Sequence, residues 1–497
     1  MGSVVTIFNH FMFVTKERKK QVMFQQKRLW ILATLIISAL LWAACAPAAA
    51  PAGDGAAPAA DAPAADAGGA REIVWMVRTS PVENNWETTV VKPAWEKESP
   101  DIALNILTIN QNDVAVKREA MIAAGEPLHV WSTNWGGDGF ASDRHRGLLT
   151  DLTPLIERDK LDTGVFIPEV LKIYQSEGKT WGLPFLTTGT YVFYNMDLFD
   201  EAGIAYPTTD WEDKSWNWDA YLDLAKQLTK NYDDPANAQY GLIQNRMNIE
   251  GPAMLFGQFP WPADAYETGF ADQITLNTPE VIDAYQKHHD LVFKEKVAPD
   301  DAASQALTQL GGAFESGRVA MTYNGGWGWW VYSPVKPEVE GGFCWGVAPI
   351  PWGTDDAETR AVIYTDPWVI TRGLEGQVLD DSWSFLKFLV REDNARSYMQ
   401  ASNTPPTQAK LQEEWFGQFG CMEPEKVKEV YQGAFAHGFE SSNHLLVRWD
   451  ELNQIWNNSL SAFFLDPAGN AADVMPALEE ELNDALTRIA EEEGHTQ

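Results

Sequence analysis

The sequence predicts an α/β protein with two hydrophobic cores, in which mostly parallel sheets are flanked by helices. Short apolar runs alternate with helical runs in the early part of the folded region, as in parallel strands joined by helices. The roughly 430 residues from Arg71 onward are too many for one core and are the usual size of a two-domain protein. A hydrophobic content of 45% and a charged content of 22% are typical of globular proteins.

The early elements follow one another in order. Strands are expected at 72–77, 102–107 and 128–132, with helices at 86–98 and 113–124 between them. The loops 78–85 and 133–143 follow the first and third of these strands, at the carboxyl edge where such sheets bind ligands. Further helices are expected at 218–228, 279–293, 380–391 and, with an apolar stripe from Val474 to Ile489, at the C-terminus. We expect these stripes to pack in the cores.

Residues 1–44 have the pattern of a secretory signal peptide. A basic run precedes an uncharged apolar stretch from 29 to 44. This stretch is shorter than the roughly 20 residues of a membrane-spanning helix, and small residues followed by a cysteine end it. We therefore expect it to be cleaved. Translation could start at Met1 or at Met23, since either leaves a complete leader.

Residues 45–70 predict a disordered tether. They are almost entirely Ala, Pro, Gly and Asp, so they have no large aliphatic side chains with which to form a core. When extended, this segment could reach roughly 80–90 Å.

The three cysteines have different expected roles. The run Leu41-Trp42-Ala43-Ala44-Cys45 resembles a bacterial lipobox, which implies cleavage before Cys45 and a lipid on its sulfur. The alternative is a plain secretory leader with an incidental cysteine. Cys344 and Cys421 could form a disulfide after export or remain as two free thiols, and the sequence does not decide between these states.

Composition and motif searches exclude several function classes. A formal net charge of −33 disfavours binding to nucleic acid or to an anionic membrane surface. No zinc-protease, serine-hydrolase, phosphate-loop or dinucleotide motif occurs. The 8 histidines are scattered, so we expect neither a metal site nor a cofactor. Acid pairs such as Asp355-Asp356 are expected by chance among 70 acidic residues, and we interpret them as solvated.

Tryptophan is in large excess, with 22 residues. Many lie beside Gly, Asn, Asp or Thr, as in the runs 135–138, 324–330 and 364–368. Aromatic rings can stack on the C–H faces of a sugar, while Asp, Asn and Arg bind its hydroxyl groups. These runs therefore indicate a sugar site, although any single tryptophan could pack in a core instead. The residues singled out in them are Trp327, Trp329, Asp366 and Trp368.

Several motifs follow one another in a specific order and spacing. They are Thr180-Trp181-Gly182-Leu183-Pro184, Tyr194-Asn195-Met196-Asp197-Leu198-Phe199, Ser215-Trp216-Asn217-Trp218-Asp219, Phe314-Glu315-Ser316-Gly317-Arg318 and Trp345-Gly346-Val347-Ala348-Pro349. In this order the sequence resembles the family 1 extracellular solute-binding proteins of sugar importers, over about residues 72–490.

The resemblance implies a periplasmic-binding-protein-like fold. Two α/β lobes would be joined by crossing strands and would hinge together around a ligand. The implied bounds are 71–186 with 363–406 for the first lobe and 187–362 with 407–497 for the second. The implied crossings lie near 184–188, 360–364 and 404–408.

The resemblance also implies ligand-binding positions, because maltodextrin binders of the family share the run around Trp327, where a tryptophan stacks on sugar. The positions assigned in this way are Thr79, Ser80, Trp131, Asn134, Thr188, Tyr323, Trp327, Trp329 and Trp449. At Thr79, Ser80, Asn134 and Thr188 the family's charged residues are replaced, which argues against maltose itself.

The sequence therefore predicts a substrate-binding subunit of an ABC importer and no enzyme activity. It would be an extracytoplasmic monomer, anchored to the membrane by a lipid on Cys45, that delivers a sugar or oligosaccharide to the permease's transmembrane subunits. Two alternatives are a binder of a non-sugar solute on the same fold and an extracellular carbohydrate-active enzyme. The aromatic excess disfavours the former, and the lack of a placed catalytic pair disfavours the latter. The sequence does not indicate whether the lobes rest open or closed.

Overall fold

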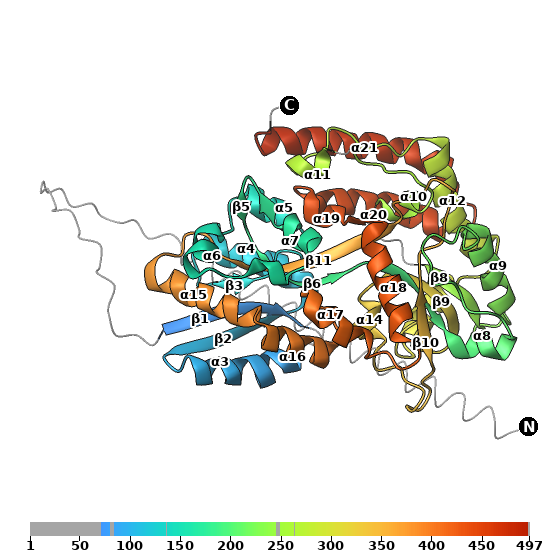
Figure 1. Cartoon of the computed structure of the whole chain (residues 1–497). Helices are drawn as coiled ribbons and strands as arrows, with labels where there is room; N and C mark the ends of the chain where they lie inside the picture. The colour runs from blue at the N-terminus through green and yellow to red at the C-terminus, as the bar shows by residue number, and fades with distance from the viewer. Residues whose placement is uncertain (1–70, 80–83, 136, 245–248, 263, 496–497) are drawn as a thin grey trace, which may run out of the picture. The chain divides into compact units, whose positions relative to one another are not determined.

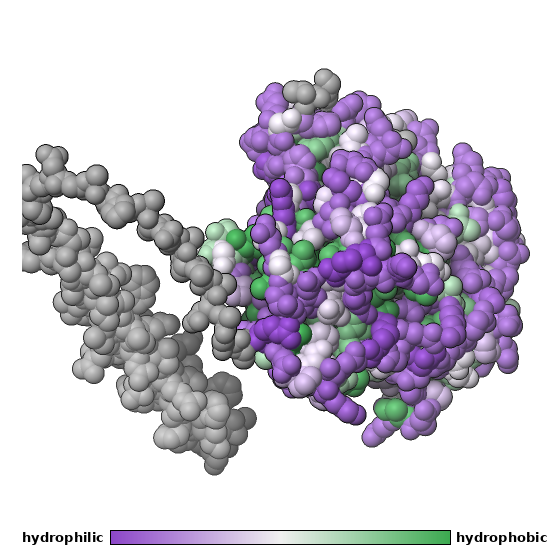
Figure 2. All heavy atoms as spheres, turned by 60° about the vertical axis from the view of Figure 1, so that its left-hand side comes forward, coloured by the Kyte–Doolittle hydropathy of each residue, from purple (hydrophilic) through white to green (hydrophobic). Residues whose placement is uncertain are grey.

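The computed structural model of the chain describes residues 71–79, 84–135, 137–244, 249–262 and 264–495 (Figure 1). The signal peptide, Cys45, the tether and Ser80 lie outside the described residues, so their predictions remain predictions. Within the described ranges, no helix is long and apolar enough to cross a membrane. The space-filling view shows a mainly hydrophilic surface with small hydrophobic areas between the polar ones (Figure 2).

The first sheet has the strand order β12-β11-β3-β1-β2, with β6 also paired to β11. The strands β1, β2 and β3 are parallel, whereas β11 is antiparallel to both β3 and β6. Their bounds are β1 Arg71–Arg78, β2 Ile102–Ile109, β3 Val130–Trp131, β6 Leu183–Thr188, β11 Ala361–Ile370 and β12 Gly438–Glu440. The predicted strand at 128–132 is thus shorter than expected. A separate hairpin pairs β4 (Gln175–Ser176) with β5 (Lys179–Thr180).

The second sheet has the order β10-β7-β9-β8. Its strands are β7 Thr190–Asn195, β8 Tyr240–Gln244, β9 Val319–Gly325 and β10 Trp345–Ala348. Because β7 is antiparallel to both of its neighbours and β8 is parallel to β9, β7 is the strand that runs against the others. It is reversed because it continues from β6, and so enters this sheet from the side of the other core. The predicted parallel pairing therefore holds in these two sheets except for the pairs of β7 with β9 and β10 and of β11 with β3 and β6. Both β7 and β11 belong to the crossings or directly follow one.

Two strands pass from one hydrophobic core to the other. In β6, Leu183 packs in the core of the first sheet, while Leu186 packs in that of the second. In β11, Val362 belongs to the second core and Trp368 to the first. These are the crossings predicted near 184–188 and 360–364. The residue bounds of the lobes remain a prediction.

The helices cover the sheets and extend the second core. Their bounds are α2 Asn84–Trp86, α3 Lys92–Glu98, α4 Val114–Ala124, α5 Phe140–His145, α6 Thr153–Asp159, α7 Pro168–Ile173, α8 Met196–Ala202, α9 Trp218–Leu228, α10 Gly251–Met254, α11 Ala265–Thr268, α12 Pro279–Phe293, α13 Asp301–Thr308, α14 Gly328–Val331, α15 Gly376–Leu389, α16 Glu392–Ser402, α17 Ala409–Phe416, α18 Pro424–Ala436, α19 Ser442–Leu445, α20 Trp449–Leu465 and α21 Ala471–Glu492. A π-helical turn, η1 (Glu87–Val91), joins α2 to α3, and the short 3-10 helices are η2 (Gln111–Asp113) and η3 (Thr163–Val165).

A third core forms among helices and is continuous with the second. Ala284 and Leu291 of α12 pack in the second core, whereas Val281 and Tyr285 of the same helix pack in the third. The stripe predicted along the C-terminal helix also packs here, as Leu478, Leu482, Leu486 and Ile489 of α21. The helix α12 thus joins the second and third cores, which both lie mainly within the predicted bounds of the second lobe.

Two of the motifs that resemble the binding-protein family contain helix caps in this structure. The side chain of Asn195 accepts a hydrogen bond from the backbone N–H of Leu198, 3.3 Å away, at the start of α8. Asn217 caps α9 in the same way, through the N–H of Ala220 at 3.0 Å. Gly203 ends α8 in the left-handed conformation with φ of 66°. These residues specify where helices start and stop.

Cys344 and Cys421 form a disulfide. The sequence left open whether these two cysteines pair, and the structure shows that they do. The bond links the residue before β10 to the loop between α17 and α18.

Candidate functional site

The candidate site lies where the crossing strands meet the second lobe. Tyr364 of β11 is paired with Thr188 at the end of β6. Its ring is 5.2 Å from that of Trp327 and 6.0 Å from that of His444, measured between centroids. We call the group Thr188, Glu250, Tyr323, Trp327, Tyr364, Asp366, Glu440 and His444 the crossing-strand cluster.

Three carboxyl groups of the cluster are buried. Glu250 accepts hydrogen bonds from the N–H and the hydroxyl of Ser442, at 3.2 and 2.7 Å. Asp366 accepts one from the indole N–H of Trp135 at 3.0 Å. Buried carboxyl groups are costly unless hydrogen bonds compensate them. Their concentration here indicates a site suited to a polar, hydroxyl-rich ligand.

Glu440 lies on β12 beside Ile363 of β11, and its carboxyl group is hydrogen-bonded to Nδ1 of His444. Burial, together with the nearby charge of Asp366, raises the pKa of Glu440 well above its usual value. Burial lowers the pKa of His444 to about 4. Burial thus favours the uncharged form of each side chain, a protonated Glu440 and a neutral His444.

Some buried polar atoms at the edge of the cluster have no hydrogen-bond partner among the described residues. They are Oε2 of Glu440 and the hydroxyl of Tyr266. Tyr266 also packs on Phe439, with ring centroids 4.1 Å apart. Aromatic faces and unsatisfied polar atoms thus lie side by side, which suits a ligand with both C–H faces and hydroxyl groups.

The cluster brings together four of the residues predicted from the sequence: Thr188, Tyr323, Trp327 and Asp366. Trp327 is half-buried, and its ring lies over Gly325, where a Cβ would come within 2.2 Å of the indole. Gly325 therefore allows the ring to lie against the backbone, next to Tyr364.

Three of the predicted tryptophans are packed in the first and second cores. Trp131 is fully buried in the first core, donates its indole N–H to Thr371 at 2.9 Å and has Arg118 over its ring. Trp368 stacks on Phe185 with centroids 4.1 Å apart. Trp329 is fully buried in the second core. These rings are packed by protein atoms in this structure.

The remaining predicted residues have other surroundings. Trp449 begins α20 and is buried in the third core. Asn134 donates to the carbonyl of Thr365 at 2.6 Å and accepts from the N–H of Phe140 at 3.0 Å, so it joins the loop after β3 to β11. Thr79 is exposed after β1.

The sequence did not predict Glu250, Tyr364, Glu440 and His444 as site residues. A single carboxylate is hard to recognise among 70 acidic residues. The prediction that could have located Glu440 was the crossing near 360–364, because β12, which carries Glu440, pairs with that part of β11.

Metal ligands and a cavity away from the cluster are two other possible kinds of site. Among the side chains that the structure describes, no group of three His, Cys, Asp or Glu residues could hold a metal ion. A cavity of about 780 Å³ is lined by residues of both predicted lobes, among them Arg144, Trp181, Phe270 and Arg372. None of the predicted site residues lines it.

The chain was also compared with known proteins. The sequence pattern of the bacterial extracellular solute-binding proteins matches residues 80–396, which is more than half of the chain. The chain belongs to this family. Solute-binding proteins of this kind bind their substrates and are not enzymes, and the family is extracellular.

Individual relatives are distant. A binding protein of Brucella abortus (strain 2308) is 24% identical over 340 residues, which is 68% of this chain and 75% of the relative. The melibiose/raffinose/stachyose-binding protein of Bacillus subtilis (strain 168) is 22% identical over 328 residues, 63% of this chain and 68% of its own.

Solved structures confirm the two-lobed solute-binding fold. An ABC substrate-binding protein of Listeria monocytogenes in complex with cycloalternan has a TM-score of 0.67 at 21% identity, covering 84% of this chain and 99% of its own. A Mycobacterium tuberculosis protein in complex with glycerophosphocholine has a TM-score of 0.67 at 15% identity, covering 85% and 100%. At these identities the likeness concerns the fold alone.

Proposed function

We propose that this solute-binding protein captures a sugar or oligosaccharide between its lobes and delivers it to an ABC permease. The observation that carries the proposal is the crossing-strand cluster, in which Trp327 packs on Tyr364 and Tyr364 lies near the buried carboxyl groups of Glu250 and Glu440. Rings beside hydrogen-bonding groups are the combination that a sugar requires. The sugar ligands of the Bacillus and Listeria proteins favour the same substrate class.

A screen by thermal unfolding tests this proposal. The full chain would be melted with mono- and oligosaccharides, and with glycerophosphocholine as the non-sugar comparison. At a concentration 100 times Kd, a ligand adds about 2.7 kcal/mol of stability. For a folded region of this size we expect a rise in Tm of roughly 3 °C for at least one saccharide. If only glycerophosphocholine raised Tm, the non-sugar alternative would replace the proposal.

The anchor is part of the same proposal. We infer that the leader is cleaved before Cys45, that a lipid on this cysteine holds the protein at the outer side of the cell membrane, and that residues 46–70 act as the tether. The tethered protein would work as a monomer. Incorporation of a tagged fatty acid by the wild type, and none by Cys45→Ala, is the expected result. Equal labelling of both proteins would contradict the lipid anchor.

A further inference from the structure

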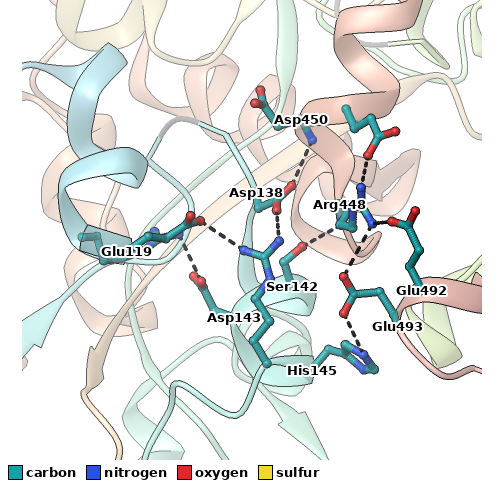
Figure 3. A network of polar contacts seen from close by, with 12 residues as sticks. Glu119, Asp138, Ser142, Asp143, His145, Arg448, Asp450, Glu492 and Glu493 are labelled. Carbon is teal, nitrogen blue, oxygen red and sulfur yellow. Dashed lines mark hydrogen bonds and ion pairs between the residues drawn. The ribbon is translucent and has the colours of Figure 1, made fainter. Parts of the chain in front are cut away.

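A small helix of the first lobe contacts the start of a long helix in the second. Phe140 of α5 packs in the first core, against Tyr174 at 5.0 Å between ring centroids, whereas the next residue, Ala141, packs in the third core. On the opposite side, α20 begins at Trp449. Figure 3 shows the polar contacts between these segments.

The N-terminus of α20 has no cap from its own segment. Its capping residue, Arg448, has a left-handed backbone with φ of 55°, and its side chain makes no capping hydrogen bond. The first N–H groups of a helix need partners from outside the helix. Here two acceptors come from the first lobe: Oδ1 of Asp138 lies 3.0 Å from the N–H of Asp450, and Oγ of Ser142 lies 2.8 Å from that of Arg448. The first lobe thus caps a helix of the second.

Asp138 and Arg448 are each held in place by charged side chains of their own lobe. The other carboxylate oxygen of Asp138 accepts a hydrogen bond from Arg146 at 2.9 Å (Figure 3). The guanidinium of Arg448 is ion-paired with Glu451 at 2.5 Å and with Glu492 of α21. The left-handed residue is therefore fixed by its side chain, with its N–H directed at Ser142.

The two segments approach each other at a glycine. A Cβ on Gly139 would lie 2.2 Å from the carbonyl oxygen of Asn443, which is closer than a Cβ atom can approach. The backbone of Gly139 has φ of −101° and ψ of −156°, a conformation that any residue can adopt. The position needs glycine because of the opposing lobe, since its own backbone would accept alanine.

We propose that Asp138, Gly139, Ser142 and the N-terminus of α20 form a closure latch, which assembles when the lobes close and sets how tightly ligand is held. The inference rests on the proposed function, since it assumes lobes that open and close around a ligand. Asp138 and Ser142 then act as positioning residues, because a ligand that selects the closed form gains the stability of the cap.

The first test is Gly139→Ala. The added methyl group obstructs closure without changing the local backbone, so we expect at least tenfold weaker binding of the tightest saccharide from the thermal screen, with the ligand-free Tm within about 2 °C of wild type. The matched control is Gly420→Ala, because a Cβ there would meet no atom within 4 Å. Wild-type affinity for Gly139→Ala would overturn the latch. So would a collapse of its Tm, which would mean that the two segments pack permanently.

The second test observes the cap directly, in the presence of a saturating concentration of the tightest saccharide, so that the lobes are closed. Amide hydrogen exchange at Asp450 would be compared in wild type, Asp138→Ala and Asp138→Asn. Alanine removes the cap, whereas asparagine keeps an acceptor oxygen, so exchange should quicken roughly two- to thirtyfold in the first variant and much less in the second. Equal exchange in wild type and Asp138→Ala would overturn the cap while leaving the proposed function untouched.

Discussion

Two aromatic regions of this molecule use the same side chains in different ways. In the first core, Trp131 and Trp368 are packed on all sides, and the indole N–H of Trp131 is bonded to a threonine. In the crossing-strand cluster, Trp327 is half-buried, packs at the edge of the second core and has its ring 5.2 Å from that of Tyr364. The tryptophan excess in this chain therefore reflects both core packing and a candidate ligand site. What separates the two uses is how far the ring is exposed.

The largest expected effect is on a ring of the first core. Trp131→Ala should lower the free energy of unfolding by about 3–5 kcal/mol, because it removes a fully buried indole and leaves a cavity. Urea denaturation of the ligand-free protein measures this. The folded fraction should bind its ligand as the wild type does. A stable variant that fails to bind would instead place Trp131 in the ligand site.

An intermediate effect should come from the proton shared by Glu440 and His444. Above pH 6.5, the usual pKa of histidine, both groups lose their protons in the unfolded chain, whereas the folded chain keeps one on Glu440. The free energy of unfolding should then fall by about 1.4 kcal/mol per pH unit as pH rises, until Glu440 also ionises in the folded state. Between pH 4.5 and 6.5 each state holds one proton, so this pair adds no slope.

Glu440→Gln tests the same point, since glutamine mimics the protonated carboxyl group and does not titrate. We expect the variant to keep its stability above pH 6.5, where the wild type loses it. Urea denaturation at pH 5.5, 7.0 and 8.5 compares the two proteins. Parallel pH profiles would mean that Glu440 is already ionised in the folded protein.

The smallest expected effect separates binding from folding at Trp327. Trp327→Ala should weaken saccharide binding by tenfold or more, at least about 1.4 kcal/mol, and leave the ligand-free Tm nearly unchanged. Calorimetric titration and melting without ligand measure the two quantities. If Tm collapsed while the folded remainder bound normally, Trp327 would belong with the core rings, and the contrast between the two regions would fail.

The sequence predicted the α/β class and several elements well, because local signals carry them. The helices at 218–228 and 279–293 have the predicted bounds, since Asn217 and Thr278 cap them and an apolar stripe runs along each. The helix expected at 380–391 begins earlier, at Gly376, and ends at Leu389. Its early turns carry little of the apolar periodicity on which that prediction rested.

The site was harder to predict, since its residues meet only in three dimensions. Glu250 and Ser442 are hydrogen-bonded although they are 192 residues apart. Trp131 and Trp327 both matched tryptophans that stack on sugar in related proteins, yet only one lies in the cluster. Whether Trp131 or Trp327 is buried depends on which strands become neighbours in the fold. No local sequence pattern predicts this.

The reversed strand β11 has a consequence for how the chain can fold. It completes the first sheet beside β3, and the bond between Trp131 and Thr371 joins residues 240 positions apart. The first lobe therefore cannot finish its core until most of the chain has been synthesised, and contacts this distant in sequence form slowly. A newly made chain would stay unfolded for longer than one with contiguous lobes. That delay would suit the proposed export of the chain across a membrane before it folds.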